Sequence, residues 1–191
     1  LYFPLKGKRT MRQSGILLHL TSLPGPEGIG TLGEEARAFV DFLRAAGMRL
    51  WQVLPLGPTG YGDSPYQSFS SFAVNPLLIS MSELRDQGLL SAAELAPLTE
   101  LPHDRVDFGA LIPLRNSLLT SAAARFLAAG AEPGFNAFVQ ANRSWLDDFV
   151  LFMALKEEHG GGIWLDWPEA ERSRDPRALA VARERLAERL R

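Results

Sequence analysis

The chain has 191 residues, of which 46% are hydrophobic and 22% are charged, and its formal net charge is -2. These values are ordinary for a folded globular protein, so they exclude a disordered chain, and they provide no basic field for a nucleic acid. The sequence contains no cysteine and no apolar run long enough to cross a membrane, which excludes a disulfide framework and a thiolate nucleophile. We therefore expect a cytoplasmic protein without nucleic-acid or membrane partners.

The first ten residues stand apart from the rest of the sequence. They have basic character but lack the apolar centre of a signal peptide, and Met11 follows them. We expect residues 1–10 to be an extension outside the fold.

Residues 11–80 predict a βαβ unit. The apolar run 16–20 predicts a buried strand, residues 33–46 carry apolar side chains at helical spacing, and residues 50–54 predict a second buried strand. Strands joined in this way are parallel, with a right-handed crossover. The loops 21–30 and 55–71 follow the carboxyl ends of the strands, where α/β proteins bind ligands.

Beyond residue 80 the pattern is mostly helical. Short helices are expected at 82–90 and 91–98, longer ones at 114–129 and 135–158, and an exposed amphipathic helix at 175–191. Two parallel strands leave both edges of a sheet uncovered, so the fold looks incomplete. We expect an α/β chain whose residues 81–191 form an incomplete helical subdomain.

The loop 54–68 has the composition of a shaped binding loop. It combines three glycines, three prolines and two tyrosines with a single carboxylate, Asp63. Glycine permits close approach of a ligand, proline fixes the backbone, and tyrosine offers a flat apolar face with a polar tip. Because the loop holds no lysine or arginine, we expect it to suit a sugar ring better than a phosphate.

Other chemistries fit the sequence less well. The glycines of the loop do not have the spacing of a dinucleotide site, and His19, His103 and His159 lie too far apart for metal-ligand spacing, so no cofactor or metal is expected. The run Gly62-Asp63-Ser64 is compatible with a serine hydrolase that uses Ser64 as nucleophile. No Asp-x-x-His pair follows late in the chain to supply its base.

Several ordered motifs resemble the bacterial 4-alpha-glucanotransferases, also called amylomaltases. The resemblance covers about residues 14–167 and is carried by GILLHLTSLPG at 15–25, GIGTLG at 28–33, WQVLPLGPTGYGDSPYQS at 51–68, FAVNP at 72–76, RVDF at 105–108, LFMALK at 151–156 and HGG at 159–161. Members of this family have a (β/α)8 TIM barrel with helical insertions. They transfer alpha-1,4-glucan segments between maltooligosaccharides with retention at the anomeric carbon.

The resemblance also implies where the chemistry is done. Retention needs two carboxyl groups about 5 Å apart, and in the family the nucleophile, the acid/base and a stabilising aspartate lie on later strands, beyond Arg191. We therefore expect no catalytic residue in this chain. Asp63 is a single acid, which could hydrogen-bond sugar hydroxyls or hold the loop in shape.

By the same resemblance, Tyr66 and Ser64 face glucan subsites near the cleavage point. Tyr61 matches a tyrosine of a second, remote glucan site. Family members that use this site can carry another aromatic residue at the position of Ile112, and its absence here weakens the case for the site. His19 is a further candidate for substrate contact, or an anchor for its loop. Two alternatives stay open: the tyrosines could only pack the loop, or the protein could bind glucan without catalysis.

Overall fold

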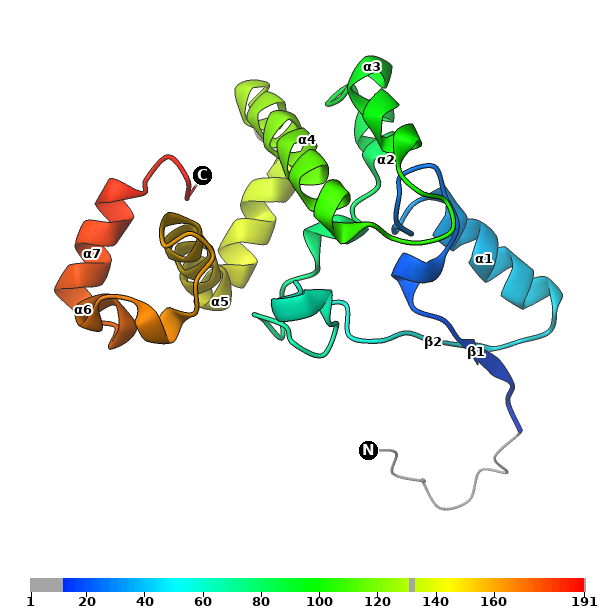
Figure 1. Cartoon of the computed structure of the whole chain (residues 1–191), viewed down its shortest axis with the longest axis horizontal. Coiled ribbons are helices and arrows are strands. Elements are labelled where there is room, and N and C mark those ends of the chain that lie inside the picture. Colours follow the sequence, from blue (N-terminus) through cyan, green and yellow to red (C-terminus); the bar gives the residue numbers. More distant parts are fainter. Residues whose placement is uncertain (1–11, 131–132, 191) are drawn as a thin grey trace. The chain divides into compact units, whose positions relative to one another are not determined.

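The computed structural model describes residues 12–130 and 133–190. The chain forms two compact units that divide between Gly130 and Ala131, and Figure 1 draws the first in blue to green and the second in yellow to red. The extension expected at residues 1–10 lies outside the described residues. The boundary expected at residues 80 and 81 rests on the change to a mostly helical pattern, and it stays a prediction.

The first unit opens with the predicted βαβ arrangement. Strands β1 (Gly15–Leu17) and β2 (Leu50–Gln52) pair in parallel, with Ile16 opposite Trp51, and helix α1 (Glu34–Ala45) joins them. Trp51 fixes the helix against the sheet, because its ring packs edge-on against the ring of Phe39, with 4.8 Å between the ring centroids. Its Nε1 donates a hydrogen bond to the carbonyl of Leu18 at 2.7 Å. The parallel pairing is confirmed.

The burial expected for these strands is wrong. Leu17 and Leu50 are both exposed, while Ile16 and Trp51 at the middle of the two strands are half-buried. Side chains alternate between the faces of a strand, so a sheet with one face against a helix buries only every second residue. Both strands are also shorter than predicted, and the 3-10 turn Leu20–Ser22 begins soon after β1.

Helices follow in the rest of the first unit. They are the 3-10 turn η3 (Pro76–Leu78), α2 (Met81–Asp86), α3 (Ala92–Leu95) continued by the 3-10 turn Ala96–Glu100, and α4 (Phe108–Ala128). Helix α4 begins six residues before the predicted start at residue 114, because the side chain of Asp107 caps it by accepting from the N–H of Ala110 at 3.1 Å. Pro113 therefore lies inside the helix.

An exposed ion pair joins α3 to α4. The Glu94 carboxylate accepts hydrogen bonds from the N–H and hydroxyl of Ser91, at 2.9 and 2.7 Å, and pairs with Arg125 at 2.8 Å. The Arg125 guanidinium and the Ser91 donors hold the pKa of Glu94 at about 2, compared with an ordinary value of 4.5. The pair contributes stability that is complete above the ordinary pKa and is lost as the pH falls through about 2.

We expect an NMR titration of the Glu94 carboxyl to give a midpoint near pH 2. In Arg125→Met the first cause of the shift is removed, so the midpoint rises toward its ordinary value. A midpoint that is the same in both proteins would contradict this assignment.

A buried ion pair forms the centre of the first unit. Arg115 of α4 is fully buried, and its Nη1 lies 3.2 Å from the Glu27 carboxylate. The same carboxylate caps the start of α2, accepting from the N–H groups of Met81 and Ser82 at 2.9 Å each. Arg115 also donates to the carbonyl of Ile79. One pair of side chains thus ties the loop 21–30, the start of α2 and helix α4 together.

The second unit consists of helices and their connections in its described residues. It contains α5 (Pro133–Glu158), the 3-10 turn η5 (Trp164–Asp166), α6 (Glu169–Arg172) and α7 (Pro176–Arg185). Leu151, Ala154 and Leu155 of α5 pack with Trp167 and with Ala182 and Leu186 at α7. Helix α7 is shorter than the predicted 175–191: the side chain of Asp175 caps its start, and the helix ends at Arg185.

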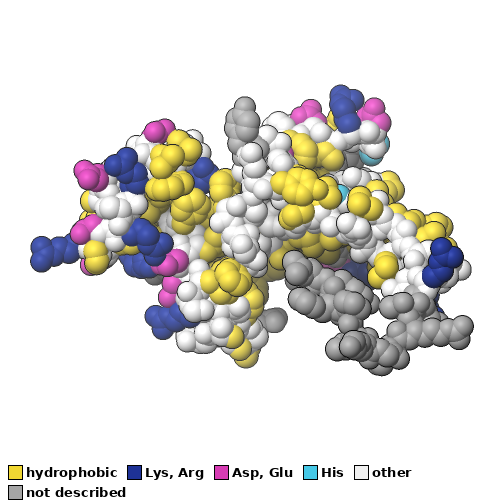
Figure 2. All heavy atoms as spheres, turned by 90° about the horizontal axis from the view of Figure 1, so that it is seen from below, with side chains coloured by type: hydrophobic (Ala, Val, Ile, Leu, Met, Phe, Trp, Pro, Cys, Tyr) yellow, Lys and Arg dark blue, Asp and Glu magenta, His cyan; other side chains and the backbone are white. Residues whose placement is uncertain are grey.

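The surface carries charges of both signs. Figure 2 shows acidic and basic side chains interspersed on the face that it presents. Within the described residues, no helix combines the length and hydrophobicity needed to cross a bilayer. The molecule is a mixed helix and sheet protein, as predicted.

Candidate functional site

The loop after β2 folds back on itself as a closed structure. The N–H of Gly60 donates to the carbonyl of Gln67 at 2.8 Å, the N–H of Phe69 donates to Pro58 at 3.2 Å, and Thr59 and Ser68 form an antiparallel bridge. A side chain on Gly57 would collide with Ser68 and the Ser70 carbonyl, so the two arms approach closely only because this residue is glycine. The loop is therefore a shaped element, as its composition predicts.

Two of the predicted site residues line one small cavity. His19 and Asp63, which are far apart in the sequence, meet at a cavity of about 50 Å³ whose wall also includes Thr21, Thr59 and Asn75. Asp63 has a φ of 52°, a left-handed conformation that aspartate tolerates better than most residues. This turn directs the chain around the carboxylate and places it beside the first loop.

His19 brings an uncharged ring to this cavity. Its Nδ1 is buried and has no hydrogen-bond partner among the described residues. Burial lowers the pKa of His19, so the ring is neutral at pH 7 and one nitrogen can donate while the other accepts. Within the described residues, the ring nitrogen Nδ1 is thus unused by the loop itself.

Asn75 has a structural role in the loop. Its Oδ1 accepts from the N–H of Leu77 at 2.9 Å and caps the turn η3. Its own N–H donates to the Leu56 carbonyl at 2.8 Å, which closes the base of the loop.

Tyr66 stands out from the loop. Its side chain is 72% exposed, so its face is available to a ligand, and packing of the loop does not account for it. Ser64 lies two residues before it, and its Oγ accepts from the N–H of Tyr66 at 3.4 Å. Neither residue lines the His19 cavity. The side chain of Tyr61, the candidate for a second glucan site, lies outside what the structure describes.

The sequence reasoning missed an apolar groove on the other arm of the same loop. Phe72 and Val74 are exposed and line a groove of about 400 Å³ together with Pro55, Leu56, Gly57, Ser68, Ser70, Ser71 and Ala73. The only available signal was the motif at residues 72–76, to which we assigned no binding role.

Carboxylates are scarce around the loop. Asp63 is the only acid among the described residues that line these two hollows. A retaining mechanism needs two carboxyl groups facing each other, so the described part of the loop holds half of what such chemistry requires at most.

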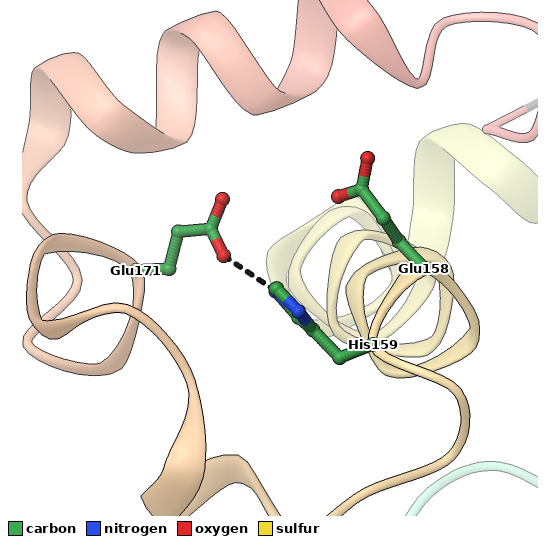
Figure 3. A group of neighbouring side chains, drawn as sticks. All are labelled: Glu158, His159 and Glu171. Carbon is green, nitrogen blue, oxygen red and sulfur yellow. Dashed lines mark hydrogen bonds and ion pairs between the residues drawn. The ribbon is translucent and has the colours of Figure 1, made fainter.

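A second group of titratable residues lies in the second unit. Figure 3 shows His159 pointing at Glu171, with Glu158 beside it; the His159 Nε2 is 2.7 Å from the Glu171 carboxylate. The ligand atoms of all three lie within 4.8 Å of one another, which could suit a metal ion. However, Arg185 of α7 already pairs with Glu158 at 2.7 Å and with Glu171 at 3.0 Å. The group therefore works as an ion-pair network that joins α6 and α7 to the end of α5.

Comparison with known proteins decides the family. The family model described as 4-alpha-glucanotransferase matches residues 18–191. The chain belongs to the 4-alpha-glucanotransferase family. A 4-alpha-glucanotransferase of Thermus thermophilus is 48% identical over 93% of this chain, and one of Streptococcus pneumoniae is 46% identical over 94%. The resemblance stated from the motifs is confirmed.

A solved structure agrees with the sequence relatives. The amylomaltase of Streptococcus agalactiae in complex with acarbose superposes with a TM-score of 0.88 and 40% identity over 94% of this chain. The match covers 37% of that amylomaltase, and the chain spans 35% and 36% of the Thermus and Streptococcus pneumoniae relatives. The chain thus corresponds to about a third of a 4-alpha-glucanotransferase.

Proposed function

We propose that this chain forms the glucan-binding amino-terminal part of a 4-alpha-glucanotransferase. The enzyme would transfer alpha-1,4-glucan segments between maltooligosaccharides and retain the anomeric configuration. Membership of the family supports this function. The observation that carries it is the closed loop, with Asp63 as its single charged residue, that presents Tyr66 beside the His19 and Asp63 cavity. The related amylomaltase whose structure contains acarbose supports an oligosaccharide ligand.

Each candidate residue has a proposed contact. Tyr66 stacks on the apolar face of a glucose ring, which suits an exposed aromatic side chain. Ser64, Asp63 and the neutral His19 exchange hydrogen bonds with sugar hydroxyls. Tyr61 contributes to a second glucan site, as the resemblance implies.

The catalytic carboxylates are proposed to lie in the part of the family's fold that this chain does not cover. The parallel pair β1 and β2 would be the first strands of a (β/α)8 barrel, with the helices after residue 80 as an insertion. The exposed Leu17 and Leu50 support this proposal, since barrel strands are covered on both faces. The absence of cysteine supports a cytoplasmic enzyme.

Incubation of the chain with maltotriose tests whether the catalytic carboxylates lie outside this chain. We expect neither glucose nor maltooligosaccharides longer than maltotriose. Transfer with retention needs two carboxyl groups that face each other. A matched reaction with a complete 4-alpha-glucanotransferase confirms that the assay detects disproportionation. Turnover by the purified 191-residue chain would show that a catalytic pair is present after all.

Two alternatives make different predictions. A glucan-binding protein without catalysis would use the same loop. It differs from the proposed enzyme because the whole natural protein would not turn over maltotriose. A serine hydrolase would show labelling of Ser64 by a fluorophosphonate probe. In the structure the Ser64 hydroxyl accepts from a backbone N–H, and a triad serine instead faces a histidine base; we therefore expect no labelling.

A further inference from the structure

The second unit contains a pocket that the proposed function does not use. It has a volume of about 290 Å³ and is lined by residues of α5, η5, α6 and α7 and of the short connections after η5 and α6. Leu151, Phe152 and Leu155 of α5 line it, together with Trp164, Trp167 and Leu179. Its charged lining consists of two acids and two bases, Asp148, Glu171, Arg172 and Arg174.

Two tryptophans give the pocket the features of a binding site. Trp164 is 47% exposed, so an indole face reaches the solvent at the pocket. Trp167 is only 7% exposed, and its Nε1 is buried without a hydrogen-bond partner in the described part of the chain. A buried N–H group without a partner is unfavourable, so an acceptor atom that reaches this nitrogen would be stabilising.

The charged groups restrict the class of ligand. Asp148 and Arg174 pair at 2.7 Å, and Arg172 donates to the Leu165 carbonyl at 3.0 Å. Figure 3 shows Glu171 turned toward His159, so its carboxylate is engaged in the ion-pair network. The four charges cancel, which disfavours a phosphate or a cation. The centre of a protein-docking surface is depleted in charged residues, unlike this pocket.

We propose that this pocket binds an alpha-1,4-glucan, with a glucose ring on Trp164, a sugar oxygen accepting from Trp167 Nε1, and further hydroxyls on Asp148 and Arg174. A flat apolar face beside planar polar groups matches a sugar ring, which is apolar on its faces and polar around its rim. The choice of glucan rests on the proposed function. The residues of this pocket differ from those of the loop 54–68 and of the groove beside it, so glucan binding at the pocket and at the loop can be measured separately.

The test is a fluorine NMR titration with maltotriose of the whole chain labelled with 5-fluorotryptophan. The chain has four tryptophans, Trp51, Trp145, Trp164 and Trp167, and conservative Trp→Phe variants assign their signals. We expect maltotriose to shift the Trp164 and Trp167 signals and to leave Trp51 and Trp145 unchanged, and cellotriose to act more weakly. Signals of Trp164 and Trp167 that stay unchanged at millimolar maltotriose would overturn the proposal.

Variants sharpen the same titration. Trp164→Ala should weaken binding about five- to tenfold, as followed by the Trp167 signal. Phe138→Ala is the matched control, because Phe138 is an aromatic residue of the same unit that is 51% exposed and does not line the pocket. Arg174→Gln should weaken binding several-fold. Because the Arg174 side chain is exposed, this variant can be used if Trp164→Ala does not fold. Equal affinity in Trp164→Ala, Arg174→Gln and Phe138→Ala would contradict the proposal.

Failure of the pocket proposal and failure of the proposed function give different results. In Tyr66→Ala the shifts of Trp164 and Trp167 should persist unchanged. If glucan binds at the loop but these signals stay fixed, the pocket proposal fails and the proposed function stands. If the signals shift while Tyr66→Ala has no effect on glucan binding, the pocket proposal stands and the role of the loop fails.

Discussion

Replacing Arg115 by methionine should lower the free energy of unfolding by about 3–5 kcal/mol, the cost of leaving a buried charge without its partner. Arg115 is fully buried and pairs with the Glu27 carboxylate at 3.2 Å. Methionine fills much of the volume but removes every donor. Glu27 would then stay buried with only the N–H groups of α2 and the Ser80 hydroxyl, 3.1 Å away.

Urea unfolding followed by circular dichroism measures this loss. Arg105→Met is the matched control, since Arg105 pairs with Asp104 at 3.3 Å on the exposed surface, and exposed pairs contribute at most about 1 kcal/mol. The double variant Glu27→Gln with Arg115→Met should recover part of the stability, because no buried charge is left unpaired. Equal losses in Arg115→Met and Arg105→Met would contradict the central role of the buried pair.

The buried pair also predicts a pH dependence. Burial raises the pKa of Glu27, but hydrogen bonds from Met81 and Ser82 and the charge of Arg115 together lower it further than burial raises it. Because the folded pKa lies below the unfolded one, the contribution is complete above the ordinary value of 4.5 and is lost as the pH falls through the folded pKa.

Gly30→Ala should destabilise the protein by about 3 kcal/mol, at the upper end of overpacking changes. A side chain on Gly30 would collide with the backbone carbonyl of Leu20 and the backbone nitrogen of Leu23. Backbone atoms yield less easily than the end of a flexible side chain. The N–H of Gly30 donates to the Thr21 carbonyl at 3.2 Å, so relief of the collision would also break the turn that supports His19.

The matched control for this change is Gly134→Ala. No atom lies within 4 Å of a side chain placed on Gly134 of α5, so alanine there should be neutral or stabilising by up to about 1 kcal/mol. Thermal unfolding of both variants gives the comparison. A Gly30→Ala protein as stable as the parent would show that the loop 21–30 can relax around a methyl group.

Local signals explain which parts of the fold could be predicted. The helices, the parallel strands and the closed loop follow from spacing, turn residues and short motifs. The Glu27 and Arg115 pair could not be predicted, because the residues are 88 positions apart and each alone looks like a surface charge. The start of α4 was predicted six residues too late, because the cap at Asp107 decides where the helix begins.

The same contrast holds for the candidate sites. Tyr66, Ser64 and Asp63 belong to one contiguous loop with unusual composition, so the sequence could single them out. Three features depend on contacts made only in the folded chain. They are the cavity shared by Asp63 and His19, the groove lined by Phe72, and the pocket lined by Trp164. Trp164 and Trp167 are close in sequence, but only the structure separates the exposed indole from the buried one.

Calorimetric titration with maltoheptaose tests most directly whether the loop 54–68 grips a glucan. The chain should bind, and Tyr66→Ala should weaken the affinity of the loop about tenfold, or about 1.4 kcal/mol, through loss of the exposed ring. Tyr66→Phe keeps the ring and should bind within about twofold of the parent. Absence of binding, or equal affinity of the loop in Tyr66→Ala and Tyr66→Phe, would contradict the role assigned to it.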